Sequence, residues 1–462
     1  MNDSVVDVVV VGGGITGLSA AYDLQRRDLS VRLLEAAPRP GGVIRTERLD
    51  GWIIDAGPDA LLVHKPAAVA LCRELGLGDR LMPTLTPRTA YILRDGRLWP
   101  IAEGSLLGFP VSLAALARSP LFTWAGKLRM AAEVFIPRTD VEDESIASFV
   151  ERRFGREALD YLGEPLLAGI HAGDADRLSV RALFPRLVEA ERQAGSVLRS
   201  IRAMRIAPSP SGAFVSLPGG VGELVDAVSA ALAPGTVRGS TRVTGLRRAG
   251  LFTVDTETGS IAARTVILSL PAYAAAALLR ALDAPLADLC DDVPYASTAT
   301  VALGYRRDQI RHPLSGTGFV VPRVEGGPLL AGTWVTSKWP GRAPAGCALV
   351  RGFLGGGRDP HRLDQSDEGL MAAAREALSE LLQIDGAPMV ERLYRFPRQS
   401  PQHEVGHLAR VASIERRAGQ IGGLFLAGSG FRAIGIPDCV ADGRQAAGRA
   451  AAYVTECKMP NA

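Results

Sequence analysis

Residues 7–48 read DVVVVGGGITGLSAAYDLQRRDLSVRLLEAAPRPGGVIRTER, and this segment is the most informative about the fold. The β-branched run at 8–11 is typical of a parallel strand that is buried on both faces. Gly12, Gly14 and Gly17 follow with the spacing of a dinucleotide-binding turn, where a helix begins and directs its amides at a pyrophosphate. The sequence therefore predicts a Rossmann-like β-α-β unit near the start of the chain.

A second predicted strand, over 31–34, ends at Glu35, where a carboxylate would bind a ribose hydroxyl. The segment RPGG at 39–42 follows, and Thr46 lies beyond it. This second glycine pair resembles the FAD-binding oxidases of the amine-oxidase type and argues against a plain NAD dehydrogenase. The alternative is a glycine-rich turn that binds no ligand, but the combination of elements favours FAD.

The composition is that of an ordinary globular protein with more than one domain. A chain of 462 residues is too long for one compact core, and 47% of its residues are hydrophobic and 22% charged. The formal net charge is +3, and no block of Lys and Arg is interleaved with aromatic residues, so no nucleic acid partner is expected. The 5 cysteines are widely spaced without a CxxC pair, which predicts reduced thiols and no metal site.

The residues MNDS carry no basic region ahead of the first apolar run, so no signal peptide is expected. No segment approaches the ~20 apolar residues of a membrane span. We therefore expect a cytoplasmic protein, with peripheral association at the inner face of the cell membrane as an open alternative. The pattern around 105–137, rich in Leu, Phe, Trp and Ala, is compatible with docking at a membrane surface, although a buried helix pair explains it equally well.

The pattern along the chain predicts an α/β protein with a discontinuous dinucleotide domain. Helical periodicity fills 105–205, a Pro/Ser-rich linker is expected at 207–212, and 299–353 alternates like an antiparallel sheet. A last strand is expected at 424–427 and a last helix at 442–454. The FAD-binding domain is predicted to comprise three separate segments, at 1–95, 213–275 and 396–462. Between them we expect a helical domain for the membrane surface or substrate channel at 96–212, and a substrate-binding domain at 276–395.

Six further segments carry a resemblance that covers essentially the whole chain. They are GIHAGDADRLSVRALFP (169–185), LPGGVGELVDAV (217–228), GTGFVVPRVEGGPLLAGTW (316–334), RAPAGCALVRGFLGGGRDP (342–360), PQHEVGH (401–407) and LFLAGSGFRAIGIPDCVADGRQAA (424–447). With the glycine turn, they resemble the oxygen-dependent, FAD-containing protoporphyrinogen oxidase family of the flavin monoamine oxidase superfamily. The resemblance implies an amine-oxidase-like fold: a Rossmann-like FAD-binding domain, a substrate domain on an antiparallel or mixed sheet, and a helical insertion.

The implied activity is oxidation of protoporphyrinogen IX to protoporphyrin IX, late in haem biosynthesis, by three successive two-electron steps. FAD takes the hydride, and O2 reoxidises it with H2O2 as product. No catalytic side chain is expected, because this chemistry needs no protein nucleophile. Cys439 does not lie in the context that tethers flavin in monoamine oxidases, so the FAD is expected to be non-covalent. Transient contact with ferrochelatase is a further hypothesis.

The same resemblance implies a set of cofactor-binding residues. They match the phosphate loop, the ribose contact, the second glycine pair, the loop close to the flavin, the adenine contact and the segment that opens the last helix. In that order they are Gly12, Gly13, Gly14, Ile15, Thr16 and Gly17; Glu35 and Ala36; Arg39, Gly41, Gly42 and Val43; Gly57, Pro58, Asp59 and Ala60; Val243; and Ile434, Gly435 and Ile436. An arginine beside phosphates is expected at Arg39 on charge grounds. A plain turn at 57–60 and a core valine at 243 are the alternatives.

Arg88, in PRTAYI, matches an arginine that in the family pairs with a propionate of the macrocycle. A planar guanidinium suits this role because it binds a carboxylate through two parallel hydrogen bonds. The remaining substrate-binding residues are a glycine of the pocket wall and three apolar side chains that sandwich the ring: Gly169, Val320, Trp334 and Phe353. Val335 is an alternative to Trp334. A surface arginine at position 88 and core packing of the apolar residues compete with these assignments.

Two residues depart from the family pattern, and three alternative functions stay open. His403 and His171 stand where the family has tyrosine or another aromatic residue, and we expect both at the pocket rim or in the core. The first alternative is coproporphyrinogen III as substrate, whose four propionates call for more cationic groups. The others are an amine oxidase or carotene desaturase on the same fold, and a flavin-binding scaffold without turnover.

Overall fold

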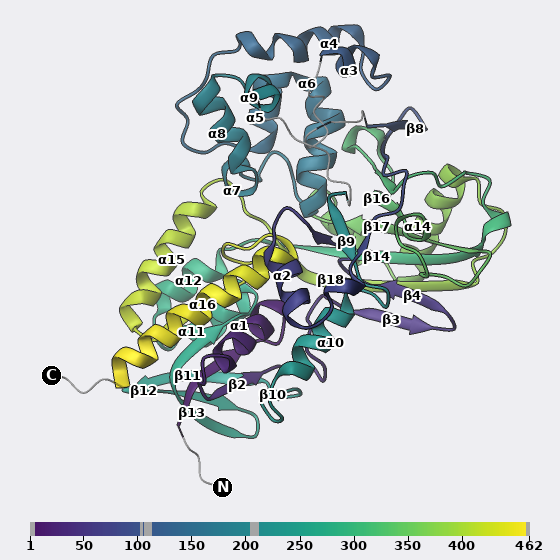
Figure 1. Cartoon of the computed structure of the whole chain (residues 1–462). Helices are drawn as coiled ribbons and strands as arrows, with labels where there is room; N and C mark the ends of the chain where they lie inside the picture. Colours follow the sequence, from purple (N-terminus) through teal and green to yellow (C-terminus); the bar gives the residue numbers. More distant parts are fainter. Residues whose placement is uncertain (1–4, 102–104, 106–112, 204–211, 459–462) are drawn as a thin grey trace.

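The computed structural model describes residues 5–101, 105, 113–203 and 212–458, and it has three regions (Figure 1). A sheet flanked by helices lies next to both termini, a second sheet lies beside it, and a helical region lies at the opposite end from the termini. Apart from Gly212, the predicted linker at 207–212 lies outside the described residues. So do 106–112 and 204–205, at the two ends of the predicted helical pattern.

The first sheet joins strands from three distant stretches of the chain. Its strands are β1 (Val6–Val11), β2 (Val31–Leu34), β10 (Val237–Arg238), β11 (Val243–Ala249), β12 (Leu251–Thr256), β13 (Gly259–Leu268) and β19 (Leu424–Leu426). Their order is β10-β2-β1-β13-β12-β11, with β19 beside β13. β10, β2, β1, β13 and β19 pair in parallel, and β11, β12 and β13 form an antiparallel meander. The predicted α/β class with a discontinuous Rossmann-like unit is confirmed.

Both faces of this sheet are buried, as the continuous apolar run of β1 predicts. Val8 and Val10 point into one core, and Val9 and Val11 into another. The first core is completed by α1 (Ile15–Gln25), α2 (Ala67–Glu74), α10 (Gly222–Ala231) and α16 (Gly435–Lys458). The second is completed by α11 (Ala272–Leu279), α12 (Ala284–Asp291) and α15 (His407–Ile421).

The second sheet is mostly antiparallel. Its strands are β7 (Ala90–Arg94), β8 (Arg97–Pro100), β14 (Tyr295–Arg306), β15 (Gly318–Val320), β16 (Leu329–Trp334), β17 (Cys347–Gly355) and β18 (Val390–Pro401), in the order β18-β14-β17-β16-β15-β7-β8. Only β15 and β7 pair in parallel. The helix α14 (Asp367–Leu382) covers one face of this sheet. The boundary predicted at residue 95 falls in the turn between β7 and β8, so it cuts a hairpin that belongs to this sheet.

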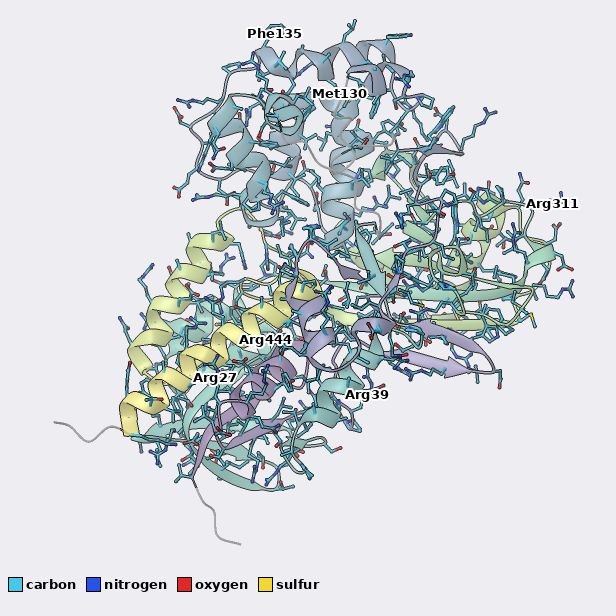
Figure 2. The ribbon with its side chains drawn as sticks, viewed as in Figure 1. Arg27, Arg39, Met130, Phe135, Arg311 and Arg444 are labelled. Carbon is cyan, nitrogen blue, oxygen red and sulfur yellow. The ribbon has the colours of Figure 1, made fainter. Side chains whose placement is uncertain are left out.

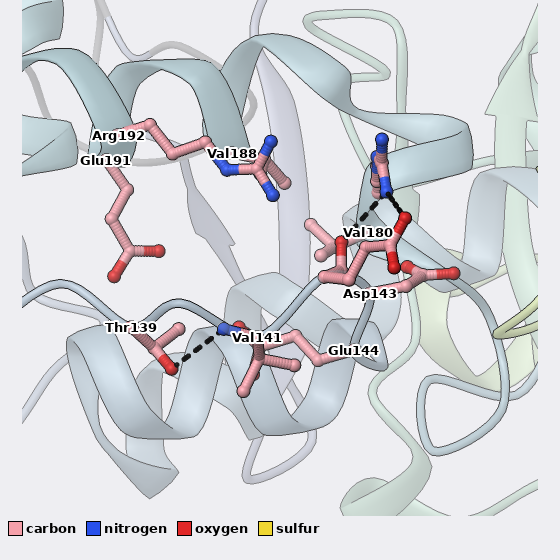
Figure 3. A pocket seen from close by; sticks show the side chains of 10 residues that line it. Thr139, Val141, Asp143, Glu144, Val180, Val188, Glu191 and Arg192 are labelled. Atoms are coloured by element: carbon pink, nitrogen blue, oxygen red, sulfur yellow. Dashed lines mark hydrogen bonds and ion pairs between the residues drawn. The ribbon is translucent and has the colours of Figure 1, made fainter.

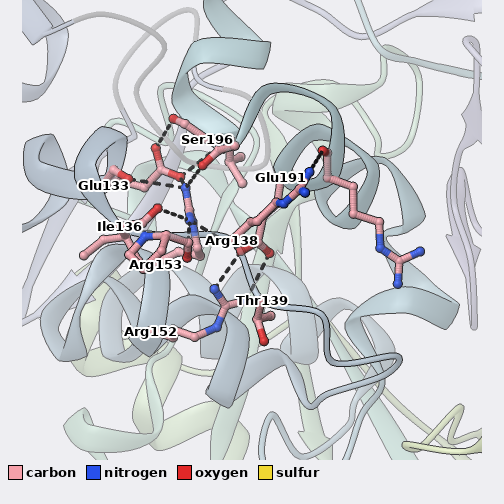
Figure 4. A network of polar contacts seen from close by, with 12 residues as sticks. Glu133, Ile136, Arg138, Thr139, Arg152, Arg153, Glu191 and Ser196 are labelled. Atoms are coloured by element: carbon pink, nitrogen blue, oxygen red, sulfur yellow. Dashed lines mark hydrogen bonds and ion pairs between the residues drawn. The ribbon is translucent and has the colours of Figure 1, made fainter.

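The helical region is built on its own core, as its periodicity predicts. It contains α3 (Leu113–Arg118), α4 (Trp124–Ala131), α5 (Ile146–Phe154), α6 (Arg156–Ala158), α7 (Val180–Leu183), α8 (Pro185–Ala194), α9 (Val197–Ala203) and a π-helix, η3 (Leu159–Ala168). Glu133 and Arg153 form an ion pair that is fully buried. The Glu133 carboxylate also accepts the Val197 amide at 2.9 Å and the Ser196 hydroxyl (Figure 4), so its charge is satisfied within the core.

The remaining elements are short. They are the β-hairpin of β3 (Thr46–Leu49) and β4 (Trp52–Asp55), the small sheet of β5 (Leu61–Leu62), β9 (Phe214–Ser216) and β6 (Met82–Pro83), the helix α13 (Val335–Lys338), and the 3₁₀ turns η1 (Gly78–Arg80), η2 (Ala132–Phe135), η4 (Gly169–His171), η5 (Arg307–Gln309), η6 (Arg323–Glu325) and η7 (Pro360–Asp364). The last helix begins at Gly435, earlier than the predicted 442. Pro437 does not prevent this earlier start, because it lies in the first helical turn, where proline is tolerated.

Candidate active site

The glycine turn between β1 and α1 has the close contacts that its glycines require. Gly12 has a φ of +105°, a left-handed value that disfavours side chains. A Cβ built on Gly17 would collide with the Gly12 carbonyl oxygen, so only glycine lets the helix pack against the strand. α1 begins at Ile15 with Gly14 as its N-cap, and Thr16 lies in its first turn. The predicted phosphate-loop residues thus form a helix N-terminus, where anions are stabilised.

A second glycine loop faces this turn. The Gly41 amide donates to the Gly13 carbonyl at 2.7 Å, and Gly14 and Gly41 form a parallel bridge. A Cβ built on Gly14 would meet no atom within 4 Å, and one built on Gly42 would meet only the Gly14 Cα, at 3.6 Å. The two loops therefore form a cradle that side chains would fill, and this shape fits the pyrophosphate of a dinucleotide.

Glu35 closes the glycine turn from the end of β2. Its Oε2 accepts the Gly13 amide at 2.6 Å, and its Oε1 accepts the Ala37 amide at 2.8 Å, with the exposed Ala36 between. The Thr241 amide donates to the Glu35 carbonyl at 2.8 Å, which brings the start of β11, and hence Val243, beside the predicted ribose contact. Residues separated by about 200 positions in the chain are thus brought to one edge of the cradle.

Arg39 contacts its own loop. Its guanidinium donates to the carbonyls of Pro40 at 2.8 Å, Gly42 at 3.2 Å and Ile44 at 3.2 Å. The predicted contact with phosphate stays a prediction, while the structure shows that Arg39 holds the shape of the second glycine loop. Val43, in the same loop, is exposed.

The loop 57–60 is held by buried charges from α13 and β17. Asp59 Oδ2 lies 2.8 Å from Lys338 Nζ, 3.0 Å from an Arg351 nitrogen and 3.3 Å from Trp339 Nε1. Burial alone raises the pKa of Asp59, but the charges of Lys338 and Arg351 outweigh it, so this pKa lies well below its usual range. Arg351 also donates to the Gly57 carbonyl at 3.0 Å, so Gly57, Pro58, Asp59 and Ala60 form a fixed loop.

A second buried pair lies beside this one. Arg342 is fully buried, and it lies 3.1 Å from Asp55 and donates to the Ser216 hydroxyl at 2.9 Å. Lys338, Arg342 and Arg351 were not predicted from sequence. The alternation of β17 carried a signal for one of them, because Arg351 and Phe353 are two positions apart and face the same side, with the guanidinium 5.3 Å from the ring centroid.

The segment 434–436 lies at the start of α16 and next to α1. The Ile434 amide donates to Asp438 Oδ2 at 3.2 Å, and the same carboxylate lies 2.6 Å from Lys65 Nζ. Gly435 has a φ of +78°, and Ile436 is buried in the core with α1. The predicted phosphate loop and the predicted flavin segment therefore belong to two helices that pack against each other.

Arg88 is exposed, and its Nε donates to the Thr84 carbonyl at 3.0 Å. A Cβ built on Gly212 would lie 2.9 Å from this Nε, so the arginine packs against the residue that leads into β9. Its guanidinium therefore lies at the surface near the small sheet of β5, β9 and β6.

Strand alternation separates the three apolar residues that were predicted to sandwich the ring. Val320 pairs with Ala331, and Ala331 pairs with Phe353, so Val320 and Phe353 share a face of the second sheet. Trp334 pairs with Val350 on the opposite face, and both are buried in the core that contains α14. The structure therefore brings Val320 and Phe353 together and places Trp334 in the core.

Val335 and Gly169 are the two remaining candidates for the substrate pocket. Val335, the alternative to Trp334, is buried in a separate cluster with Trp52 and Trp339. Gly169 lies at the end of η3, and a Cβ built on it would meet only the Glu164 carbonyl oxygen, at 3.6 Å. A side chain at Gly169 would therefore meet little of the protein.

The two histidines that depart from the family pattern differ in position. Burial, and next the charge of His403, lower the pKa of His171 to about 4. The His171 ring lies edge-on to Phe184, with centroids 5.8 Å apart. The predicted placements were the pocket rim or the core, and His403 is buried, as the core placement requires.

Two other kinds of site are absent from the described residues. In this portion of the chain, no group of three or more His, Cys, Asp or Glu side chains could hold a metal ion. Across the same residues, no helix is long and apolar enough to cross a membrane.

A small pocket lies between the segment 139–144 and the helices α7 and α8 (Figure 3), and none of the predicted site residues lines it.

The chain is similar to several known proteins over nearly its full length. Residues 15–451 match the family model described as flavin containing amine oxidoreductase. Coproporphyrinogen III oxidase of Bacillus subtilis (strain 168) is 33% identical, with 98% of this chain and 100% of the relative covered. Chloroplastic protoporphyrinogen oxidase of Nicotiana tabacum is 28% identical, with coverage of 94% and 83%. A crystal structure of a provisionally assigned protoporphyrinogen oxidase from Exiguobacterium sp. 255-15 superposes with a TM-score of 0.87 at 32% identity, with coverage of 98% and 99%.

The two-sheet fold and the glycine cradle define a flavin-dependent oxidoreductase with the amine oxidase architecture. The chain belongs to the flavin-containing amine oxidoreductase family, and within that family it is one of the porphyrinogen oxidases.

Proposed function

We propose that the protein oxidises coproporphyrinogen III to coproporphyrin III. The observation that carries this proposal is the similarity to the Bacillus subtilis coproporphyrinogen III oxidase, at 33% identity over the whole of that protein, against 28% for the tobacco protoporphyrinogen oxidase. Protoporphyrinogen IX, the substrate first expected from the sequence, becomes the second candidate, which the plant relatives support.

The distribution of basic side chains supports a substrate with several carboxylates. Lys65 lies 2.6 Å from Asp438, at the start of α16. Burial and then the charges of Lys65 and Arg186 lower the pKa of His64, so these three basic groups lie close enough to interact. With the exposed Arg88, Lys65 and Arg186 offer cationic partners for the propionates of the macrocycle.

We propose that the cofactor is FAD, bound without a covalent link. The cradle of Gly14 and Gly42 would hold the pyrophosphate, Glu35 the ribose, and the segment 434–436 and the loop 57–60 would lie against the flavin. The bound flavin would supply the hydride acceptor. Burial raises the pKa of the Cys439 thiol to about 12, so this cysteine stays protonated at neutral pH and is a poor nucleophile for a tether. Acid precipitation should release the yellow colour into the supernatant.

In the proposed reaction, six hydrogens leave the macrocycle in three two-electron steps, and each O2 takes two electrons and two protons to become H2O2. Arg88 binds a propionate, Val320 and Phe353 contact the ring, and Gly169 leaves room at the pocket wall. The protein needs no activated side chain, because its role is to orient the ring and to exclude water.

The experiment is to assay the purified protein on coproporphyrinogen III and protoporphyrinogen IX side by side, following porphyrin fluorescence and O2 uptake. We expect kcat/KM to be larger for coproporphyrinogen III and one H2O2 to form for each O2 consumed. A larger kcat/KM for protoporphyrinogen IX would overturn the substrate assignment. Oxidation of benzylamine in place of either macrocycle would overturn the reaction class.

We also propose that the helical region touches the inner face of the cell membrane. Trp124, Leu128 and Phe135 are 69%, 69% and 82% exposed, and their spacing places them on one face of α4 and η2. Figure 2 shows Phe135 at the end of the molecule that is furthest from the termini.

Transient contact with ferrochelatase, the second proposed partner, can be tested by pull-down with the two purified proteins.

A further inference from the structure

A stacked pair of buried histidines lies beneath the turn that joins β19 to α16. The rings of His403 and His407 are 4.0 Å apart between centroids and 10° from parallel. His403 is 4% exposed and His407 is fully buried. His403 follows β18 and His407 begins α15, so the pair lies where these two elements meet.

Both rings bind the backbone of this turn. His403 Nε2 lies 2.9 Å from the Ser429 carbonyl oxygen, and His407 Nε2 lies 2.8 Å from the Phe431 carbonyl oxygen. Because a carbonyl oxygen can only accept, each Nε2 carries the proton and donates it. His407 Nδ1 is buried without a hydrogen-bond partner among the described residues, so it stays unprotonated and the ring is neutral.

The turn is also held by a side chain of α16. Asp442 Oδ2 accepts the Gly428 amide at 2.6 Å, and Asp442 Oδ1 accepts Arg432 Nε at 2.9 Å. Residues 428, 429 and 431 of the turn thus each have a buried side-chain partner. The histidine pair holds the carbonyls, and the carboxylate holds an amide, so the backbone has little freedom to move.

This turn also lies against the dinucleotide helix. A Cβ built on Gly428 would lie 3.6 Å from the Thr16 hydroxyl, in the first turn of α1, and one built on Gly443 would collide with the Thr16 carbonyl oxygen. Residues 432 and 433 then lead directly into the segment 434–436. A shift of the turn would therefore move the backbone that separates the phosphate loop from the start of α16.

We propose that His403 and His407 are positioning residues for the flavin, which set the conformation of the turn 428–433 through their two Nε2–H donors. This inference rests on the flavin assignment of the proposed function. The histidines act through the backbone of Ser429 and Phe431, and they remain neutral donors that transfer no proton.

The test uses variants that keep or remove the donor. Glutamine places an amide nitrogen near the position of histidine Nε2, whereas phenylalanine keeps an aromatic ring for the stack and has no donor. The dissociation constant for FAD is measured by fluorescence quenching of the apo-protein, together with the shape of the visible flavin band. We expect His407→Phe and His403→Phe each to weaken FAD binding about ten-fold and to broaden the band. The glutamine variants should stay within about three-fold of the wild type.

His361→Phe is the matched control, because this histidine has a side chain that is 90% exposed and should leave FAD binding unchanged. Phenylalanine variants that bind FAD like the wild type would overturn the inference while the proposed function stands. Glutamine variants that lose as much affinity as the phenylalanine variants would also overturn it, because packing and not the donor would then matter. A wild-type protein that binds no FAD would overturn the cofactor assignment itself, and the inference with it. Circular dichroism shows whether the phenylalanine variants fold. If they do not, FAD affinity like that of the wild type in the folded glutamine variants supports the inference, and loss of FAD affinity in them overturns it.

Discussion

The Asp59 carboxylate lies 2.8 Å from the Lys338 ammonium, a residue 279 positions further along the chain. This contact joins the loop after the β3–β4 hairpin to α13, the helix that follows β16, and therefore ties that loop to the second sheet. Neither partner is much exposed, at 12% for the Asp59 side chain and 15% for that of Lys338. The pair is supported by Arg351, so one carboxylate holds one cation from α13 and one from β17.

Asp59→Asn should destabilise the fold strongly. The amide would leave Lys338 and Arg351 buried without their counter-charge, and breaking a buried ion pair costs about 3–5 kcal/mol. Urea unfolding of the variant measures this loss. The control is Asp308→Asn, whose carboxylate is 73% exposed and should matter little. Equal midpoints for the two variants would show that the Asp59 charges are not coupled.

Gly14→Val should abolish flavin binding without unfolding the protein. The built Cβ of Gly14 meets no protein atom within 4 Å, and its φ of −66° suits any residue, so the side chain would enter only the cradle. We expect a colourless protein with an unfolding midpoint like that of the wild-type apo-protein. Gly17→Val is the contrast, since its side chain would collide with the Gly12 carbonyl and should prevent folding. A yellow Gly14→Val protein would contradict the placement of the pyrophosphate.

Arg88→Ala should raise KM for porphyrinogen about ten- to a hundred-fold and leave the FAD content unchanged. A charge-assisted hydrogen bond to a carboxylate contributes about 1.5–3 kcal/mol, and the proposed contact with a propionate would form in the ground state as well as the transition state. Steady-state kinetics on both macrocycles give the measurement. Arg97→Ala removes another exposed arginine, from β8, and should have no effect. A normal KM for the Arg88 variant would mean that the pocket lies elsewhere.

Stability should fall as the pH drops from about 6.5 towards 4.5. Burial is the largest cause that lowers the pKa values of His171, His403 and His407. The pKa falls to about 4 for His171 and to about 3 for His407. Above about 6.5 both the folded and unfolded chains hold these rings neutral, whereas below it the unfolded chain binds protons first, so stability is lost as the pH falls. Each ring contributes a slope of up to about 1.4 kcal/mol per pH unit. Denaturant unfolding at several pH values should show this slope reduced in His171→Phe. An unchanged slope would contradict the lowered pKa of His171 in the folded protein.

Vesicles that contain anionic lipid should bind the protein through the exposed stripe on α4 and η2. Flotation at low salt should carry the wild type upward, and Leu128→Glu with Phe135→Glu should leave it at the bottom, because two charges would enter the apolar layer. The matched control is Val324→Glu with Met389→Glu, two apolar residues that are 53% and 58% exposed outside the helical region. Wild-type protein that fails to float would remove the proposal of a membrane contact.

The beginning of the chain could be predicted from sequence because its structure depends on local contacts. The run at 8–11 becomes β1, and the glycines after it meet partners within the same β-α-β unit, as for Gly17 against Gly12. The helical region was recognisable for a similar reason, since a period of 3.6 residues follows from one face of a helix packing on a core. The family resemblance then extended the prediction to the whole chain, but only as a set of candidate positions.

The tertiary structure alone decided which of those positions lie together. Trp334 and Phe353 are both apolar residues in strand patterns, and the pairing of β16 with β17 sends them to opposite faces of one sheet. Asp59 and Lys338 could not be matched from sequence, because a charged residue carries no local mark of the partner that will make its burial tolerable. Local sequence was sufficient to predict the elements whose stability comes from neighbours along the chain. The proximity of the candidate site residues depends on contacts between residues hundreds of positions apart, and those exist only once the strands have paired.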